Sequence, residues 1–324
     1  MEETTRATAH LGSIALCGFL AGCAALAGSP ATSPHAHWRA HAWPLPQCPS
    51  SPLRAPAAGP ALLAGAVADL ALDRIATALN AAAAADREGV AWAGTDARYL
   101  WFGQATGGAS IEAPVAALAG CIIVALTDRG DADPSRWCAA YDAAPAAGRA
   151  FARACTNDGR RLLELASRDV PGGASPTGIG LPHLYAEVRL RPSRDGAAIT
   201  PEVVALHYPQ ALQARQDATR DLAFTLQLRL PEETKGANLL VLLRDITPGQ
   251  MSDESAPDFI QDATLWTAAP AFPGGRPVPA DIGAGIGPVN IGLEIRETGD
   301  TNAFLQALTA AFNGLGPAFS KALK

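Results

Sequence analysis

The stretch HLYAEVRLRPSRDGAAITPEVVALHY, residues 183–208, decides the fold class. Its first half alternates between apolar and polar side chains, and the apolar set is Leu184, Ala186, Val188 and Leu190. A period of two is typical of a strand with one buried face. An Asp-Gly pair, which favours a hairpin turn, separates this segment from a second apolar run. The stretch therefore predicts two antiparallel strands, in a register that places His183 opposite His207 because prolines bracket both the strands and the turn.

Further strands follow towards the C-terminus. The segments DLAFTLQLRL (221–230) and PVNIGLEIRET (288–298) alternate, whereas ANLLVLLRDI (237–246) is apolar on both faces, as in a strand buried between layers. Helices are predicted in an Ala-rich segment (61–86), in the middle of the chain (146–168) and in an amphipathic segment after Asp300. The predicted class is α+β: an antiparallel β-sandwich-like body with an N-terminal Ala-rich helix, a mid-chain helical insertion and a C-terminal amphipathic helix.

Composition limits the function. The chain has 324 residues, of which 48% are hydrophobic and 17% are charged, and its formal net charge is −6. This length permits a sizeable core. Because the balance of charge is acidic, a nucleic-acid partner is not expected.

The N-terminal stretch LGSIALCGFLAGCAALAG, residues 11–28, has no charged side chain. Its 18 residues are marginal for a membrane span, and a short apolar run followed by small residues is typical of a secretion signal. Leu20-Ala21-Gly22-Cys23 resembles the lipobox of bacterial lipoproteins. That resemblance implies cleavage of residues 1–22 and lipidation of Cys23, and Ala24 in the next position implies sorting to the outer membrane.

The residues after Cys23 predict a tether and then one domain. Residues 23–60 are rich in proline, which favours extended conformations. We therefore expect a lipid-anchored tether over 23–60 and a single periplasmic α+β domain over 61–324. The segment LEIRETGDTNAFLQAL (293–308) loosely resembles the last strand and helix of uncharacterised proteobacterial envelope proteins, a resemblance that implies no activity.

The cysteine count agrees with export. Removal of Cys17 with the signal, and lipidation of Cys23, leave four cysteines that are candidates for disulfides: Cys48, Cys121, Cys138 and Cys155. Four cysteines allow three connectivities, and four buried free thiols remain the alternative. The pairing of Cys138 with Cys155 is favoured because it closes a short local loop, and it leaves Cys48 to pair with Cys121.

Signatures of catalysis are sparse. The sequence contains no GxSxG, HExxH or P-loop motif, and we expect no cofactor. His183 and His207, if they face each other across two strands, are candidates for metal binding or proton transfer, although a pair of exposed strand-end histidines is the more favoured interpretation. The segment HAHWRAH (35–41) and the acidic segment that starts at Asp128 are weaker metal candidates, and a solvated linker and a polar turn are favoured there.

The resemblance to bacterial lipoproteins thus implies an outer-membrane lipoprotein on the periplasmic face, and the lack of catalytic motifs favours a non-catalytic binding or scaffolding role in the cell envelope. Its expected partners are the membrane, through the lipid anchor, and a candidate envelope protein. The alternatives are a periplasmic small-ligand or metal-binding protein and a hydrolase with a non-standard site.

Overall fold

A computed structural model gives the structure of the chain. It describes residues 37–50, 90–102, 120–128, 133–143, 145, 149–167, 180–192, 198–212, 219–229, 237–249, 251–253, 260–261, 267–268, 276–277 and 285–298. The signal segment, Cys23, the Ala-rich segment 61–86 and the segment after Asp300 lie outside these residues. Across the part that is described, no helix is long and apolar enough to cross a membrane.

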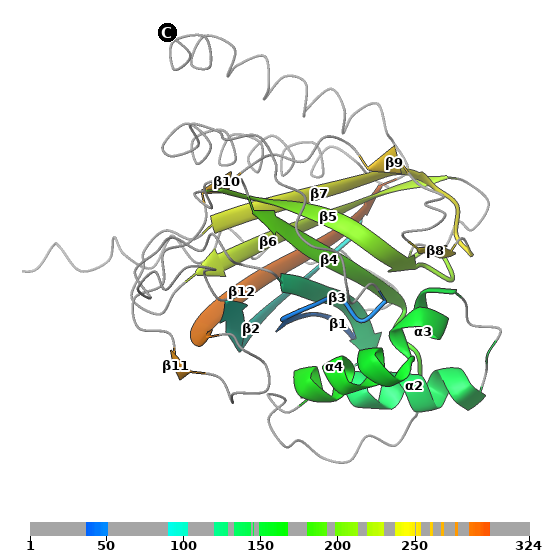
Figure 1. Ribbon diagram of the computed structural model, residues 1–324. Coiled ribbons are helices and arrows are strands. Elements are labelled where there is room, and N and C mark those ends of the chain that lie inside the picture. The colour runs from blue at the N-terminus through cyan, green and yellow to red at the C-terminus, as the bar shows by residue number, and fades with distance from the viewer. Residues whose placement is uncertain are drawn as a thin grey trace, which may run out of the picture.

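Two antiparallel sheets make up most of the body (Figure 1). The first sheet joins, in order, β1 (Trp38–Leu45), β3 (Gly120–Asp128), β4 (Leu184–Pro192), β5 (Ala198–His207) and β10 (Thr267–Ala268), and β8 (Met251–Asp253) also pairs with β5. The second sheet joins β11 (Arg276–Pro277), β12 (Gly285–Thr298), β6 (Arg220–Arg229), β7 (Ala237–Ile246) and β9 (Ile260–Gln261), and β2 (Val90–Phe102) also pairs with β12. The prediction of an antiparallel β-rich body is confirmed, whereas the predicted Ala-rich and C-terminal helices lie outside the described residues.

The two sheets pack face to face over one apolar interior. Strands β1, β3, β4, β6, β7 and β12 contribute alternate side chains, as the period of two predicts. The second sheet contributes Leu222, Phe224, Leu226 and Leu228 from β6 and Val289, Ile291, Leu293 and Ile295 from β12. Full burial of such a side chain contributes about 1.5–3 kcal/mol before the loss of conformational entropy. The hydrophobic pattern therefore fixes which face of each strand points inwards.

The register of the central hairpin differs from the prediction. Tyr185, rather than His183, lies opposite His207, so the pairing is shifted by two residues. The register shifts again between Glu187 and Val188, where β5 contains Val204 as an extra residue. A β-bulge of this kind is not visible in the symmetric placement of prolines on which the predicted register depended.

The sheets also meet along two edges, where side chains replace strand-to-strand hydrogen bonds. At the first edge, the Ala42 amide of β1 donates to Asp96 Oδ2 of β2 at 3.0 Å. At the second edge, the Val203 amide of β5 donates to Gln261 Oε1 of β9 at 2.8 Å, and Gln261 Nε2 donates to the Pro201 carbonyl at 3.2 Å. These side chains form hydrogen bonds with backbone groups at the two edges. Fewer backbone amides and carbonyls therefore remain there to pair with a strand of another chain.

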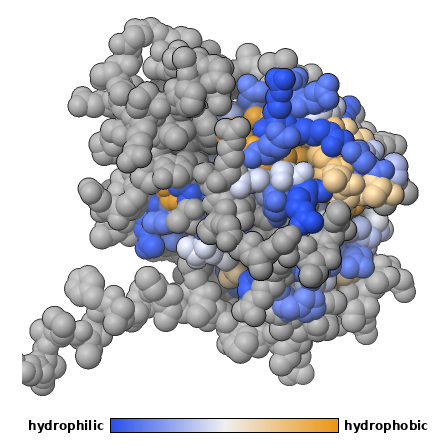
Figure 2. Space-filling view, turned by 90° about the horizontal axis from the view of Figure 1, so that it is seen from below, coloured by the Kyte–Doolittle hydropathy of each residue, from blue (hydrophilic) through white to orange (hydrophobic). Residues whose placement is uncertain are grey.

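Three short helices cover the outward face of the first sheet (Figure 1). They are α2 (Pro134–Ala143), α3 (Arg149–Ala154) and α4 (Asn157–Ser167). Asp133 precedes α2, and its Oδ1 accepts a hydrogen bond from the Ser135 amide at 3.1 Å, as an N-cap residue does. Figure 2, seen from below, shows that the described surface on that side is mostly hydrophilic, with a smaller hydrophobic area. Between the three helices and the first sheet lies a second apolar cluster, to which both contribute buried side chains.

Trp137 of α2 lies at the centre of this second cluster. Its ring is edge-on to that of Trp43 at 5.4 Å and to that of Tyr185 at 5.8 Å between centroids. All three side chains are at most 1% exposed. This packing joins the helices to β1 and β4.

Two disulfides lie in or beside this cluster, with the connectivity predicted from the sequence. The helix disulfide joins Cys138 to Cys155, and the sheet disulfide joins Cys48 to Cys121. They close loops with sequence separations of 17 and 73 residues. The sheet disulfide therefore fixes the segment after β1 to the start of β3.

The predicted boundary between tether and domain at residue 60 is wrong for one segment. Trp38–Leu45 forms strand β1 of the first sheet, and Trp38, Ala40 and Ala42 contribute to the interior. The strand tolerates Pro44, whose missing amide hydrogen is acceptable in a strand that pairs with β3 alone among the described strands. The folded body thus begins no later than Trp38, and 14 residues separate Cys23 from this strand.

Candidate functional site

Two histidines and one aspartate meet where β1 begins. His37 Nε2 lies 3.0 Å from Asp128 Oδ1, and His183 Nε2 lies 3.1 Å from Asp128 Oδ2. The three side chains come from the residue before β1, the last residue of β3 and the residue before β4. They are 60%, 44% and 23% exposed in the order His37, Asp128, His183. One carboxylate therefore faces two imidazoles at a position that solvent can reach.

Trp38 holds the least exposed member of this group. The His183 ring stacks on the Trp38 ring with 3.9 Å between centroids and an interplanar angle of 19°. The His183 backbone amide also donates to the Leu126 carbonyl at 2.8 Å. Trp38 itself is 3% exposed and lies 5.7 Å from Trp92, so His183 rests on a packed surface.

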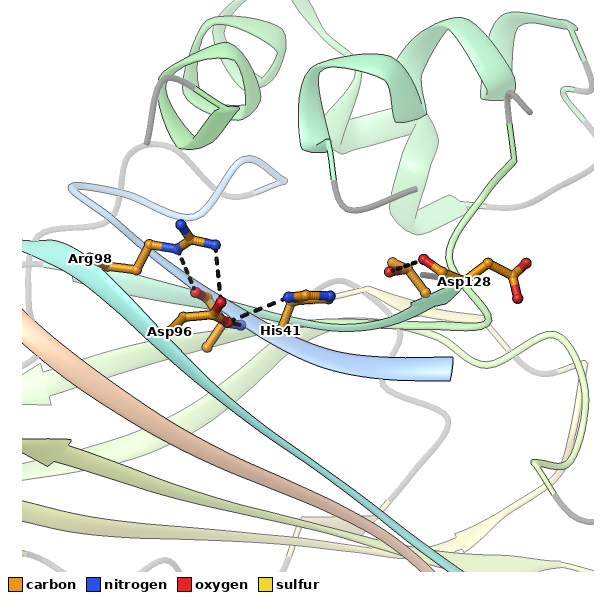
Figure 3. Close-up of polar contacts among 6 residues, drawn as sticks. His41, Asp96, Arg98 and Asp128 are labelled. Atoms are coloured by element: carbon orange, nitrogen blue, oxygen red, sulfur yellow. Dashed lines mark hydrogen bonds and ion pairs between the residues drawn. The ribbon is translucent and has the colours of Figure 1, made fainter. Parts of the chain in front are cut away.

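A second histidine–carboxylate pair lies further along β1 (Figure 3). His41 Nδ1 is 3.6 Å from Asp96 Oδ2, which is longer than a hydrogen bond. Arg98 Nη2 lies 3.3 Å from Asp96 Oδ1, and its Nε donates to the Ala42 carbonyl at 3.4 Å. Burial alone would raise the pKa of Asp96, but His41, the Ala42 amide and the Arg98 charge hold that pKa below its usual value. This pair therefore stabilises the edge between β1 and β2.

Glu187 is a fully buried carboxylate beneath the helices. Its oxygens accept hydrogen bonds from the Ser50 amide at 3.0 and 3.2 Å, from Ser50 Oγ at 2.6 Å and from the Tyr185 hydroxyl at 2.5 Å. Burial raises the pKa of Glu187 in spite of these donors, and burial together with the Glu187 charge raises that of Tyr185 well above its usual value. The alternation of β4 suggested a polar face here, but α2–α4 and the segment after β1 cover it.

The only group of potential metal ligands that lie within 4.8 Å of one another, among the residues that the structure describes, is Cys48, Cys121 and Glu187. Both sulfurs are bonded to each other in the sheet disulfide. Since a thiolate, not a disulfide, is the metal ligand, this group has no metal-binding capacity in the oxidised protein.

A second fully buried carboxylate, Glu297, lies at the end of β12. Its Oε2 accepts hydrogen bonds from the Tyr208 hydroxyl at 2.7 Å and from the Leu212 amide at 2.6 Å. Arg220 Nε, also buried, is 3.7 Å from Glu297 Oε1. Burial, followed by the negative charge of Glu297, raises the pKa of Tyr208. The Glu297 group connects the end of β5 to the second sheet and is closed to solvent.

The structure does not bring His183 and His207 together. His183 contacts Asp128 and Trp38, whereas His207 is 2% exposed, and its ring lies 5.0 Å from that of Phe151. Burial lowers the pKa of His207 to about 4. The metal site proposed from that pair depended on the register, and the observed register removes the juxtaposition.

The sequence contained one signal for strand β1, which positions this site, but the proline-rich composition around it favoured another interpretation. Residues 38–42 alternate between apolar and polar side chains, which is the pattern of a strand, but the surrounding prolines favoured a tether. The contacts that join His37 and His183 to Asp128 span about 90 and 55 positions of the chain and have no local signal, because they depend on strand pairing.

Comparisons with models of known protein families, with curated proteins and with solved structures find no match to this chain.

Proposed function

We propose that this chain is an outer-membrane lipoprotein whose β-sandwich-like body has a non-catalytic binding or scaffolding role in the cell envelope. The anchor is a diacylglycerol on Cys23, and the body lies on the periplasmic face. Sorting follows from Ala24, which stands where an aspartate would retain a lipoprotein at the inner membrane.

The observation that carries the proposed location is the pair of disulfides. Persistent disulfides are typical of proteins in oxidising compartments, such as the bacterial periplasm. Four of the six cysteines are paired in the body, and the other two, Cys17 and Cys23, lie in the N-terminal segment. This division is what an exported chain with a lipidated cysteine requires.

The proposed absence of catalysis is supported by where the perturbed groups lie. A catalytic group needs both a shifted pKa and access to substrate. Tyr185, Glu187, His207 and Tyr208 have shifted pKa values, and each is at most 2% exposed. Asp96, whose pKa is also shifted, is 16% exposed and is bound by the Ala42 amide and the Arg98 guanidinium. Their partners are other side chains or backbone amides of the same core, which favours a structural role.

The geometry also limits how far the body extends from the membrane. At most 14 residues separate Cys23 from β1, so a fully extended linker reaches about 50 Å. This distance is shorter than the tether expected from the sequence, because β1 belongs to the folded body. The role that fits is contact with a partner close to the membrane surface.

Palmitate labelling in a bacterial host tests the anchor. We expect the wild-type chain and Cys17→Ser to incorporate label and Cys23→Ser to lose it. The Cys17→Ser variant is a matched control because it removes a thiol from the same apolar run. Equal labelling of the wild type and Cys23→Ser would refute the anchor.

Membrane fractionation and crosslinking test the sorting and the role. The wild-type chain should sediment with outer membranes, and Ala24→Asp should move to the inner membrane. Crosslinking in intact membranes should join the wild-type chain to one stoichiometric envelope protein, and this product should be lost in Cys23→Ser. The proposal is contradicted if the wild-type chain forms no such crosslinked product. It is also contradicted if the wild-type chain fractionates with the inner membrane.

A further inference from the structure

We propose that His37, Asp128 and His183 form a binding site for one divalent transition-metal ion, with Zn²⁺ as the best-fitting ion. The site is independent of the lipid anchor and of the proposed scaffolding role. It joins three residues that are far apart in the sequence at the point where the folded body begins.

The donor set fits this class of ion. Imidazole nitrogens and carboxylate oxygens are the common non-sulfur ligands of Zn²⁺, and three protein ligands leave a fourth tetrahedral position for water. Hard ions such as Mg²⁺ and Ca²⁺ prefer sites made of oxygen alone. With two nitrogens and one carboxylate, the site therefore selects a borderline ion.

Both imidazoles already lie against the same carboxylate, each on a different oxygen. Each Nε2 points at a different oxygen of Asp128, at 3.0 Å from His37 and 3.1 Å from His183. Coordination requires about 2.0–2.2 Å from each ligand atom to the ion. One ion would bind the carboxylate and both nitrogens, and any proton on the Nε2 atoms would be released to solvent.

One side chain has to move for this to happen. The three ligand atoms are not among the described groups that lie within 4.8 Å of one another. His37, which at 60% is the most exposed of the three side chains, is the one that would rotate towards the ion. The ring of His183 is held by its stack on Trp38, and the backbone of Asp128 is held by the pairing of β3 with β1. Two fixed ligands and one adjustable ligand therefore make up the site.

The nearby pair of His41 and Asp96 does not offer an equivalent site. Its carboxylate already accepts the Ala42 amide, and the Arg98 guanidinium 3.3 Å away would repel a cation. Figure 3 shows this group together, with the Asp128 carboxylate directed away from His41. His41 therefore provides a matched control on the same strand.

The test is calorimetric titration of the metal-free, full-length chain in detergent, without a polyhistidine tag, with Zn²⁺ alone. We expect one equivalent to bind to the wild type and to His41→Ala. Binding should weaken by at least about tenfold in His37→Ala, His183→Ala and Asp128→Asn. Asp128→Asn keeps the shape of the side chain, so it tests the site even if His183→Ala fails to fold.

A second readout identifies the ligands. Co²⁺ in place of Zn²⁺ should give the visible absorption bands of a four-coordinate site in the wild type and in His41→Ala, but not in Asp128→Asn. Zn²⁺ should also raise the Tm of the wild type and leave that of Asp128→Asn unchanged. Equal Zn²⁺ affinity in the wild type and Asp128→Asn, or loss of binding in His41→Ala alone, would overturn the proposal.

Discussion

Replacement of His207 by leucine should remove much of the acid sensitivity of the fold. His207 is 2% exposed, and its Nδ1 has no hydrogen-bond partner among the described residues. Burial lowers its pKa from 6.5 to about 4. The folded state thus favours the neutral ring, whereas the unfolded chain protonates it below about pH 6.5.

The sign and size of the effect follow from this difference. Above pH 6.5 the His207 ring is neutral in both states and the fold keeps its full stability. As the pH falls, protonation of His207 in the unfolded chain lowers the free energy of unfolding. This loss stops growing near pH 4, where the folded state also protonates. A shift of this size corresponds to about 3 kcal/mol at that limit and to about 2 kcal/mol at pH 5. The His207→Leu variant lacks this pH-dependent loss of stability, because leucine does not titrate.

Urea unfolding followed by tryptophan fluorescence, under non-reducing conditions and at a series of pH values, measures the effect. At pH 7.5 the two chains should differ by less than about 1.5 kcal/mol, because leucine suits an apolar site of this size. Between pH 7.5 and pH 5 the wild type should lose about 2 kcal/mol more than the variant. Carboxylates such as Glu187 titrate in both chains, so their contributions cancel in the comparison. Parallel curves for the two chains over this range would refute the assignment of a buried neutral imidazole.

Two further predictions concern covalent and steric constraints. Replacing both cysteines of the helix disulfide by serine should lower the free energy of unfolding by about 3 kcal/mol. The same change in the sheet disulfide should lower it by about 4 kcal/mol, because that loop is longer. Denaturant titrations that give the opposite order would contradict this account. Gly94→Ala should destabilise by more than about 2 kcal/mol, because its Cβ would lie 1.9 Å from the Ala40 carbonyl oxygen where β1 crosses β2. Gly292→Ala on β12 is the control, since its Cβ would lie 3.6 Å from Gln227 Cβ, and thermal melts that shift equally for both variants would exclude a close approach at Gly94.

Local pattern determined the strands and their inward faces. In β6 and β12, the alternation of apolar residues identifies the buried side chains, because one face of a strand must be removed from water. The short loop between Cys138 and Cys155 likewise makes their disulfide predictable, since the cross-link depends on a small sequence separation. These features require only neighbours in the chain.

The tertiary structure decided what covers each face and which distant residues meet. Glu187 belongs to the polar face of β4 by sequence, yet it is fully buried because Ser50 and the helices pack on that face. The pairing of β4 with β5 differs from the symmetric register and includes a bulge, so His207 lies opposite Tyr185 and not opposite His183. Pairing of β1 with β3 brought His37 to Asp128 instead. Strand register and layer packing depend on contacts between segments tens of residues apart. Local pattern therefore determined strands such as β6 and β12, whereas the assembled sheets decided that Trp38–Leu45 is a strand and which residues form the site.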